Sequence, residues 1–168
     1  MLELNALWWS GCDMKIERSL RELEVLALEL QPPLVLDSNS GVAAVIAAMR
    51  RHGLGYALLE TDGRLAGIFT ERDVLLSVIG NAAVLAEPVA RHMTTDPARV
   101  KGGDPVWRVI VMMHEGGYRQ VPVVDGEDRI LACVRHKDIA GYLVDHFAAH
   151  VLNLPPDPEQ VAQTPEGG

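Results

Sequence analysis

A threonine and an aspartate three positions apart follow a short apolar run in the segment GIFTERDVL, where Thr70 precedes Asp73. Residues at this spacing share the first turn of a helix, so their side chains can act together. A helix N-terminus with a hydroxyl suits a phosphate group, and a carboxylate can accept hydrogen bonds from both hydroxyls of a ribose. The same pair also fits a capping box, which stabilises a helix start without any ligand. The pattern alone leaves both interpretations open.

The segment ACVRHKDIA has the same shape near the other end of the chain, but its chemistry differs. Asp138 is retained, whereas Arg135 stands where the first segment has Thr70, and Ala132 stands where it has Gly67. Loss of the hydroxyl removes a helix cap and a phosphate hydrogen bond together. The arginine can replace the phosphate contact by its charge, or fill the site by its bulk. We therefore expect two sites that are not equivalent, with the competent one at Thr70.

The elements that must position these residues occur twice. In each unit an extended run precedes an amphipathic helix, a hairpin and a second helix, and Asp73 and Asp138 lie 65 positions apart (138 − 73). Neither unit is large enough to bury both faces of its own sheet, so the two should pack together. The sequence predicts an α/β fold made of two β-α-β-β-α units. The expected ranges in unit 1 are 33–37, 41–53, 56–60, 65–70 and 71–80, and in unit 2 they are 97–101, 104–117, 120–125, 130–134 and 135–147.

The segments outside the repeat have their own patterns. Between Met14 and Leu30, apolar residues recur at three- and four-residue steps and predict an amphipathic helix that ends at Pro32 and Pro33. The last residues are rich in Pro, Gly and Gln and are expected to be poorly ordered. The expected division is an N-terminal segment over 1–31, unit 1 over 32–81, a linker with unit 2 over 82–150, and a tail over 151–168.

Composition excludes several classes of function. A net charge of −8 without a Lys/Arg cluster argues against a nucleic-acid partner. No uninterrupted apolar stretch is long enough for a membrane span, and the N-terminus does not read as a secretory signal. Cys12 and Cys133 are too few for a metal set or a disulfide framework, which fits a reducing, cytoplasmic location. No nucleophile–base pair, metal set or cofactor loop is evident, so we expect no enzyme and no catalytic or metal-binding residues.

The doubled unit with GIFTERD, and with HMTTDP and YRQVPVVD in the second copy, resembles a tandem CBS-domain pair, or Bateman module, of the standalone type. The resemblance covers about residues 32–147. It implies a pseudo-twofold pair that forms homodimers, with four units in a flat disc. It also implies clefts between units that bind adenosine-containing ligands such as AMP, ADP, ATP or S-adenosylmethionine.

The resemblance also implies which residues line each cleft. Each cleft would combine the helix start of one unit with strand residues of the other. The second cleft is the doubtful one, because Arg135 replaces the threonine at its helix start. The expected first site consists of Thr70, Arg72, Asp73, Ala98, Arg119, Gln120, Val121 and Pro122, and the second of Gly55, Tyr56, Arg135, His136 and Asp138.

Two hypotheses about function follow. The first is a non-catalytic sensor that binds an adenine nucleotide as a regulatory ligand and modulates a protein partner that the sequence does not name. The alternative is a dimeric assembly module without a small ligand, held together by the helices that contain Met49, Trp107 and Met113.

Overall fold

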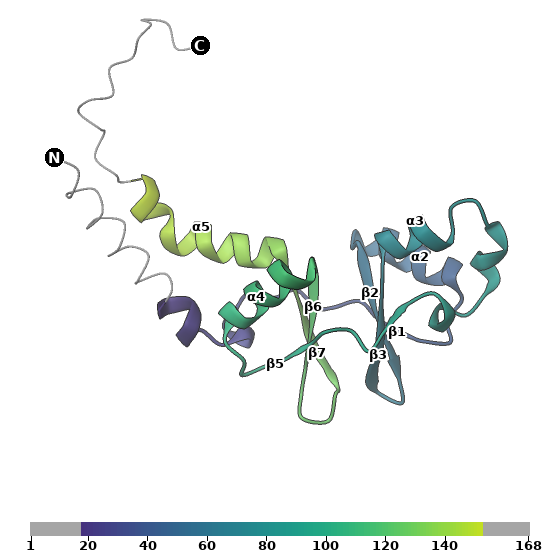
Figure 1. Cartoon of the computed structure of the whole chain (residues 1–168), viewed down its shortest axis with the longest axis horizontal. Coiled ribbons are helices and arrows are strands. Elements are labelled where there is room, and N and C mark those ends of the chain that lie inside the picture. Colours follow the sequence, from purple (N-terminus) through teal and green to yellow (C-terminus); the bar gives the residue numbers. More distant parts are fainter. Residues whose placement is uncertain (1–17, 153–168) are drawn as a thin grey trace, which may run out of the picture.

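The structure is a computed structural model, and it describes residues 18–152, with side chains through residue 145. It confirms the α/β class and the repeated unit (Figure 1). The elements are β1 (Val35–Asp37), α2 (Val42–His52), β2 (Tyr56–Thr61), β3 (Arg64–Thr70), α3 (Glu71–Ser77), β4 (Thr94–Thr95), β5 (Val100–Lys101), α4 (Val106–Gly116), β6 (Gln120–Val124), β7 (Ile130–Arg135) and α5 (His136–Leu152), with three-ten helices η1 (Val25–Ala27), η2 (Ala82–Ala86) and η3 (Val89–Arg91).

Each unit is built around one small sheet. The first has the order β1-β2-β3-β4 and the second the order β5-β6-β7; in both, the first pair is parallel and the hairpin antiparallel. The amphipathic helix expected over 41–53 is confirmed as α2, because Val42, Val45 and Met49 on one face are all buried in the unit 1 core. Gly53 and Gly117 end α2 and α4 in the left-handed conformation, which glycine adopts without a steric penalty.

The two hairpins differ by one residue in their turns. In unit 1, Asp62 and Gly63 both have positive φ, the conformation required by a tight two-residue hairpin turn. In unit 2, five residues separate β6 from β7. The Asp125 N–H donates to Arg129 O, which leaves three residues in the turn itself, and Asp128 takes the positive φ. This turn therefore accommodates one extra residue, because Met49 and Met113 before the hairpins are 64 positions apart, whereas Asp73 and Asp138 after them are 65 apart.

A set of hydrogen bonds shows that the segment before each unit packs on the other unit. The N–H of Val25 donates to Asp104 O, and the N–H of Val89 donates to Ser40 O. These two bonds are related by an offset of 64 positions (89 − 25 and 104 − 40). Two further pairs of bonds are related by the same offset. In the first pair, Leu26 N–H donates to Gly102 O and Ala90 N–H donates to Ser38 O. In the second, Val106 N–H donates to Leu23 O and Val42 N–H donates to Glu87 O. The repeat thus extends upstream of both predicted units.

This crossed packing explains why the predicted N-terminal helix is wrong over its second half. The described helix covers 18–22, and η1 follows instead of further helical turns. Leaving the helix lets Val25 and Leu28 enter the unit 2 core. Ala27, which a continuous helix would place on the same apolar face as Leu20 and Leu23, is exposed. Tertiary packing against unit 2 overrides the local helical periodicity. Residues 14–17 of the prediction lie outside the described residues.

The two units meet through the hairpins β2–β3 and β6–β7, which lie side by side in the middle of Figure 1 with the helices to either side. Tyr56, Leu58 and Ile68 from unit 1 form a buried apolar cluster with Cys133 from unit 2. The units therefore share a core.

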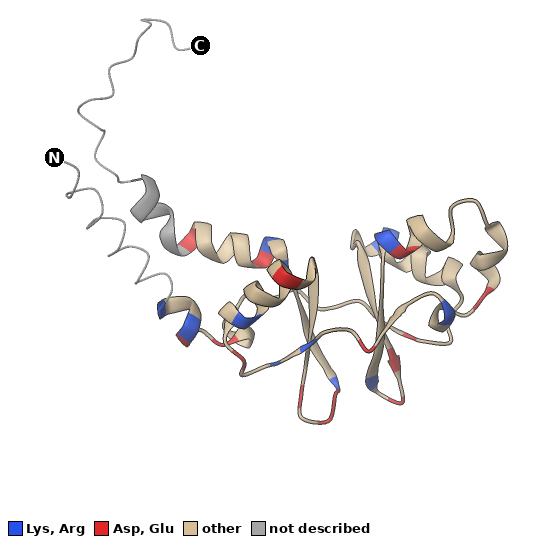
Figure 2. Ribbon diagram, in the orientation of Figure 1, with Lys and Arg blue, Asp and Glu red and all other residues tan. Residues whose placement is uncertain are grey.

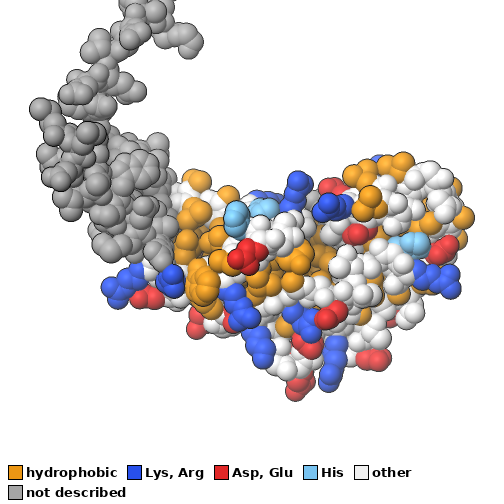
Figure 3. Space-filling view, in the orientation of Figure 1, with side chains coloured by type: hydrophobic (Ala, Val, Ile, Leu, Met, Phe, Trp, Pro, Cys, Tyr) orange, Lys and Arg blue, Asp and Glu red, His pale blue; other side chains and the backbone are white. Residues whose placement is uncertain are grey.

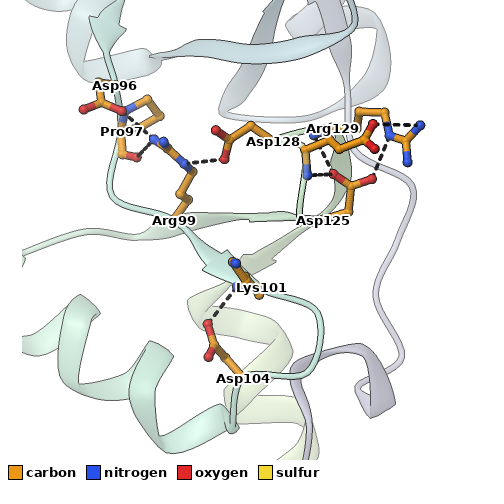
Figure 4. Close-up of polar contacts among 9 residues, drawn as sticks. Asp96, Pro97, Arg99, Lys101, Asp104, Asp125, Asp128 and Arg129 are labelled. Carbon is orange, nitrogen blue, oxygen red and sulfur yellow. Dashed lines mark hydrogen bonds and ion pairs between the residues drawn. The ribbon is translucent and has the colours of Figure 1, made fainter.

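A polar junction joins the units at the turn side of the hairpins (Figure 4). Leu65 N–H donates to Asp128 O at 2.9 Å, which links β3 to the β6–β7 turn. Arg99 then pairs with the carboxylates of both Asp96 and Asp128. Arg99 thus joins the linker to the β6–β7 turn, and the Leu65 bond joins the same turn to the hairpin of unit 1.

Candidate functional site

Thr70 and Asp73 form a capping box at the start of α3. The backbone N–H of Thr70 donates to Asp73 Oδ2 at 2.8 Å, and the Thr70 hydroxyl reaches the same oxygen at 2.7 Å. No hydrogen bond among the described residues reaches Asp73 Oδ1. The capping function considered from the sequence is therefore present, and it leaves one carboxylate oxygen available in a half-buried position.

Two other predicted residues of unit 1, Arg72 and Gly55, lie at this helix start in different environments. Arg72 is exposed on α3, free to turn its charge toward an approaching anion. The Glu71 carboxylate lies over Gly55, where an added Cβ would come within 3.1 Å of it. Glu71 N–H also donates to Gly55 O at 3.1 Å. Gly55, predicted for the second site, is thus tied to the start of α3.

Unit 2 contributes strand residues of unequal accessibility to the first predicted site. Arg119 is exposed and Gln120 is half-buried, so both side chains are accessible. Val121 is fully buried in the unit 2 core and Pro122 is buried opposite Cys133, so neither presents a free side chain. The assignment of Val121 and Pro122 to the first site therefore stays a prediction, with both side chains buried. No hydrogen bond or ion pair of the described residues joins Arg119 or Gln120 to Thr70 or Asp73.

Ala98 lies half-buried between Pro97 and Arg99, directly before β5. Arg99 is held by Asp96 and Asp128, so this part of the linker has a fixed position in the polar junction shown in Figure 4. Ala98 is thus well anchored, although no hydrogen bond among the described residues joins it to Thr70 or Asp73.

The second helix start repeats the backbone geometry of the first. Arg135 N–H donates to Asp138 Oδ2 at 2.8 Å, as Thr70 N–H does to Asp73. The side chains differ: Arg135 Nε donates to Asp138 Oδ2 at 2.9 Å, and Nη2 donates to Oδ1. A third donor, Nη1, reaches Gln31 Oε1 at 3.0 Å. The Arg135 and Asp138 side chains are only 9% and 7% exposed.

The structure brings Tyr56 of unit 1 close to this pair, whereas His136 points to the exposed surface. Burial raises the pKa of the Tyr56 phenol well above its usual range, and the Cys133 thiol beside it adds to the shift. Burial likewise raises the pKa of the Cys133 thiol to about 12. The charges of Arg135 and Asp138 act on both groups, which places Tyr56, Cys133, Arg135 and Asp138 in one cluster.

Gln31 and Cys133 belong to this second cluster but were not predicted. Gln31 directly follows the segment expected to be a helix, and no spacing rule connects it to Arg135. Cys133 was visible only as an apolar residue of β7. One sequence signal could have indicated that the N-terminal segment contacts unit 2. It is the repeat offset of 64, which relates Val25 to Val89.

Two hollows are formed by the described residues, and the first of them lies beside the start of α3. One of about 590 Å³ is lined by Gly55, Glu71 and neighbouring residues of α2 and α3: Ile46, Met49, Arg50, Gly53, Leu54, Val74 and Leu75. The other, of about 340 Å³, is lined by Arg99, Val100, Lys101, Asp104, Arg108, Val124 and Asp128. Neither includes Thr70 or Asp138.

Charges are mixed along the ribbon, with Lys and Arg interspersed among Asp and Glu (Figure 2). Among the described residues, no three or more His, Cys, Asp or Glu side chains gather as a metal site would require. Within the same part of the chain, no helix has the length and apolar character needed to cross a bilayer.

Comparisons with known proteins agree on one family. The CBS domain family model matches residues 27–80 and 89–145. An uncharacterised 17.7 kDa protein of Acidianus ambivalens is 26% identical over 131 residues, with 77% of each chain covered. The L-aspartate semialdehyde sulfurtransferase of Methanocaldococcus jannaschii is 25% identical over 111 residues, but the match spans 66% of this chain and 21% of that enzyme.

Solved structures share the fold. The CBS domain pair of protein MJ0100, in complex with 5′-methylthioadenosine and S-adenosyl-L-methionine, superposes with a TM-score of 0.66 at 22% identity, covering 73% of this chain and 97% of that one. A CBS domain protein of Pyrobaculum aerophilum complexed with AMP gives a TM-score of 0.64 at 22% identity, covering 69% and 89%.

Proposed function

This chain belongs to the CBS-domain family, with two tandem copies, and from that premise we propose that it is a regulatory module that binds an adenosine-containing ligand and modulates a protein partner. CBS pairs are generally regulatory and non-catalytic. The ligand classes we propose are AMP, ADP, ATP and S-adenosylmethionine, and the proposed location is the cleft at Thr70 and Asp73.

The observation that carries the proposal is the state of Asp73. Its Oδ2 is fixed by the backbone and hydroxyl of Thr70, while its Oδ1 has no hydrogen bond among the described residues. A fixed carboxylate with one free oxygen is prepared to accept a hydroxyl of a ribose, because its orientation needs no further ordering. The free N–H groups of the adjoining helix turn favour a phosphate next to it.

Three further side chains would complete this site. Arg119 and Arg72 are both exposed and supply positive charge for a phosphate group. Gln120 is half-buried at the edge of β6 and offers amide groups for the ribose or the base. Ala98, held in place by its neighbours, would contact the face of the base. The ligands in the AMP complex and in the S-adenosylmethionine complex of the two structural relatives are of the proposed class.

A calorimetric titration with AMP, ADP, ATP, S-adenosylmethionine and NADH tests the proposal. We expect at least one of the adenosine ligands to bind, and Asp73→Asn to weaken it by about tenfold or more, because a charged acceptor is lost. Asp62→Asn is the matched control: it makes the same chemical change at an exposed turn with positive φ, which Asn tolerates. Absence of binding by every compound, or equal losses in both variants, would contradict the proposal.

A second candidate, assembly of copies, is favoured by the exposed apolar side chains on the helices. Leu75, Leu76 and Ile79 are exposed at α3, and Trp107 and Val111 are exposed on α4. Figure 3 shows such side chains over α4 and α5 and, across the molecule, over α3. Met49 and Met113, which were expected to support the dimer, are buried within the two unit cores. We therefore propose that a homodimer forms through the exposed helix faces and coexists with ligand binding.

The absence of catalysis is part of the same proposal. The sulfurtransferase relative is several times longer than the matched segment, so its activity belongs to a larger protein. ATP incubated with the protein should remain intact, with AMP and ADP measured by chromatography. Turnover that Asp73→Asn abolishes would overturn the non-catalytic assignment.

A further inference from the structure

The two helix starts of this chain share a backbone geometry and differ in what fills them. In both, the residue before the helix donates its N–H to the aspartate three positions later at 2.8 Å. At the first start the side chain is a threonine hydroxyl, and one carboxylate oxygen stays free. At the second, the guanidinium of Arg135 binds both oxygens of Asp138.

Arg135 is therefore an internal occupant of the second cleft. Bidentate pairing with a carboxylate is the strong and oriented mode of an arginine side chain. A ribose hydroxyl would have to displace the Nε or Nη2 donor to reach Asp138. Both side chains are more than nine-tenths buried, so displacement would leave a charge without its partner in a dry site.

A second side chain closes the cleft from unit 1. Tyr56 is paired with Thr70 across the first hairpin, as Gln120 is paired with Arg135 across the second. Gln120 is half-buried, whereas Tyr56 is almost completely buried against Cys133. Tyr56 is also close enough to Arg135 and Asp138 for their charges to affect its pKa. The aromatic ring thus occupies the position where the first site keeps an accessible amide.

Gln31 holds the arginine from a third direction. Its Oε1 accepts from Arg135 Nη1 at 3.0 Å, across 104 positions of sequence. The backbone leading to Gln31 is itself bound to unit 2 through Val25 and Leu26. The guanidinium is therefore restrained by its own helix start and by the crossed N-terminal segment.

We propose that Arg135, with Tyr56 and Gln31, closes the second cleft, so that each chain takes one adenosine-containing ligand, at the Thr70 cleft only. Arg135 is then the residue that decides the stoichiometry. The stoichiometry rests on the proposed function, whereas the closure of the cleft does not.

Calorimetry with AMP and, separately, with S-adenosylmethionine tests the stoichiometry. The parent should bind one equivalent per chain, and Arg135→Thr, which restores the hydroxyl of the first cleft, should bind two. Arg129→Thr removes an exposed arginine that pairs with Asp125 and should keep one. Two equivalents in the parent, or one equivalent in a folded Arg135→Thr variant, would overturn the proposal.

Thiol labelling tests the closure without any ligand. In a Cys12→Ser background, Cys133 is the remaining cysteine. It is buried against Tyr56 and should react slowly with a thiol reagent. Gln31→Ala should raise its labelling rate by about tenfold, because local opening becomes easier. Gln31→Glu, which keeps an acceptor for Arg135, should leave the rate close to that of the parent. If no adenosine-containing ligand of the calorimetric panel binds the parent but this labelling pattern holds, the proposed function fails and the closure stands. An unchanged rate in Gln31→Ala overturns the closure.

Discussion

Gly67 of β3 lies so close to the backbone of Thr94 that a Cβ at residue 67 would stand 2.8 Å from Thr94 O. The cause is the short strand β4, which pairs with β3 through Gly67 and Ile68. In unit 2, β7 forms the edge of its sheet among the described residues, and Ala132 takes the equivalent position. The Gly-to-Ala difference between the two segments therefore reflects strand pairing.

Replacing Gly67 by Ala should destabilise the fold by about 1–3 kcal/mol, the usual cost of overpacking. The Met93 side chain, which a Cβ would also meet, can move, but the Thr94 carbonyl is part of β4 and must shift with it. Chemical denaturation measures the effect. Gly103→Ala, where a Cβ would meet nothing within 4 Å, is the control. Equal stability of the two variants would show that β4 is not held against β3.

Loss of the Thr70 hydroxyl should weaken α3 independently of any ligand. Thr70→Val keeps the shape but removes the group that binds Asp73, so we expect a loss of about 1 kcal/mol in the free energy of unfolding. Thr70→Ser retains the hydroxyl and should remain within a few tenths of the parent. Ligand affinity should follow the same order, because the hydroxyl also orients the carboxylate. A Val variant as stable and as tightly binding as the Ser variant would remove the threonine from both functions.

The Tyr56 phenol and the Cys133 thiol are buried at the interface between the units, so we expect the protein to lose stability at alkaline pH. Burial raises the pKa of Cys133 from 9.0 to about 12, and raises that of Tyr56 above its ordinary value of 10.0. The folded chain keeps protons that the unfolded chain releases, so this stabilisation is complete below pH 9 and falls as the pH rises toward 12. Each group contributes a slope of at most about 1.4 kcal/mol per pH unit.

Denaturant unfolding from pH 7 to pH 10.5 measures this loss. Cys133→Ala and Tyr56→Phe remove one titrating group each, so each variant should lose less stability above pH 9 than the parent does. A variant that carries both Cys133→Ala and Tyr56→Phe provides the contrary outcome. If its free energy of unfolding depends on pH as that of the parent does, the interface groups do not titrate as their burial indicates.

The repeated unit was predictable because its signals are local. The face of α2 and the turn at Asp62 and Gly63 each depend on residues a few positions apart. The crossed segments were not predictable in the same way. Val25 is buried by a unit that begins some seventy positions later, and its neighbours still follow a helical pattern. A local pattern cannot show which of two competing surfaces a segment will cover.

In the candidate site, too, the local features were predictable and the long-range contacts were not. The Thr70–Asp73 pair was expected to form a helix start, and the hydrogen bonds that it makes are those of a capping box. The asymmetry with Arg135 was also visible, but its outcome was open, since an arginine can bind a phosphate or fill the cleft. A third contact of the Arg135 guanidinium, beside its two bonds to Asp138, is made by Gln31, 104 positions away. Long-range contacts of this kind have no signature in a single sequence.

Truncating Val25 should test whether the N-terminal segment is part of the unit 2 core. Val25 is completely buried there, so Val25→Ala should cost about 1.5–3 kcal/mol from lost burial and the remaining cavity. Val144→Ala, on the exposed face of α5, makes the same change and should be nearly neutral. Unfolding monitored by circular dichroism compares the two. Equal stabilities would mean that the segment contributes little to the fold.

A charge on the exposed face near the end of α3 should separate the proposed homodimer. Leu76 and Ile79 are 76% and 68% exposed, so Leu76→Glu and Ile79→Glu should hardly affect the stability of one chain. In a dimer interface each carboxylate would lose its water without gaining a partner, which costs several kcal/mol. Light scattering should therefore show a dimer for the parent and a monomer for the double variant. Leu85→Glu, at an exposed apolar residue of η2, is the control and should remain dimeric. A double variant that stays dimeric would exclude this face from the interface, and a monomeric parent would exclude the homodimer.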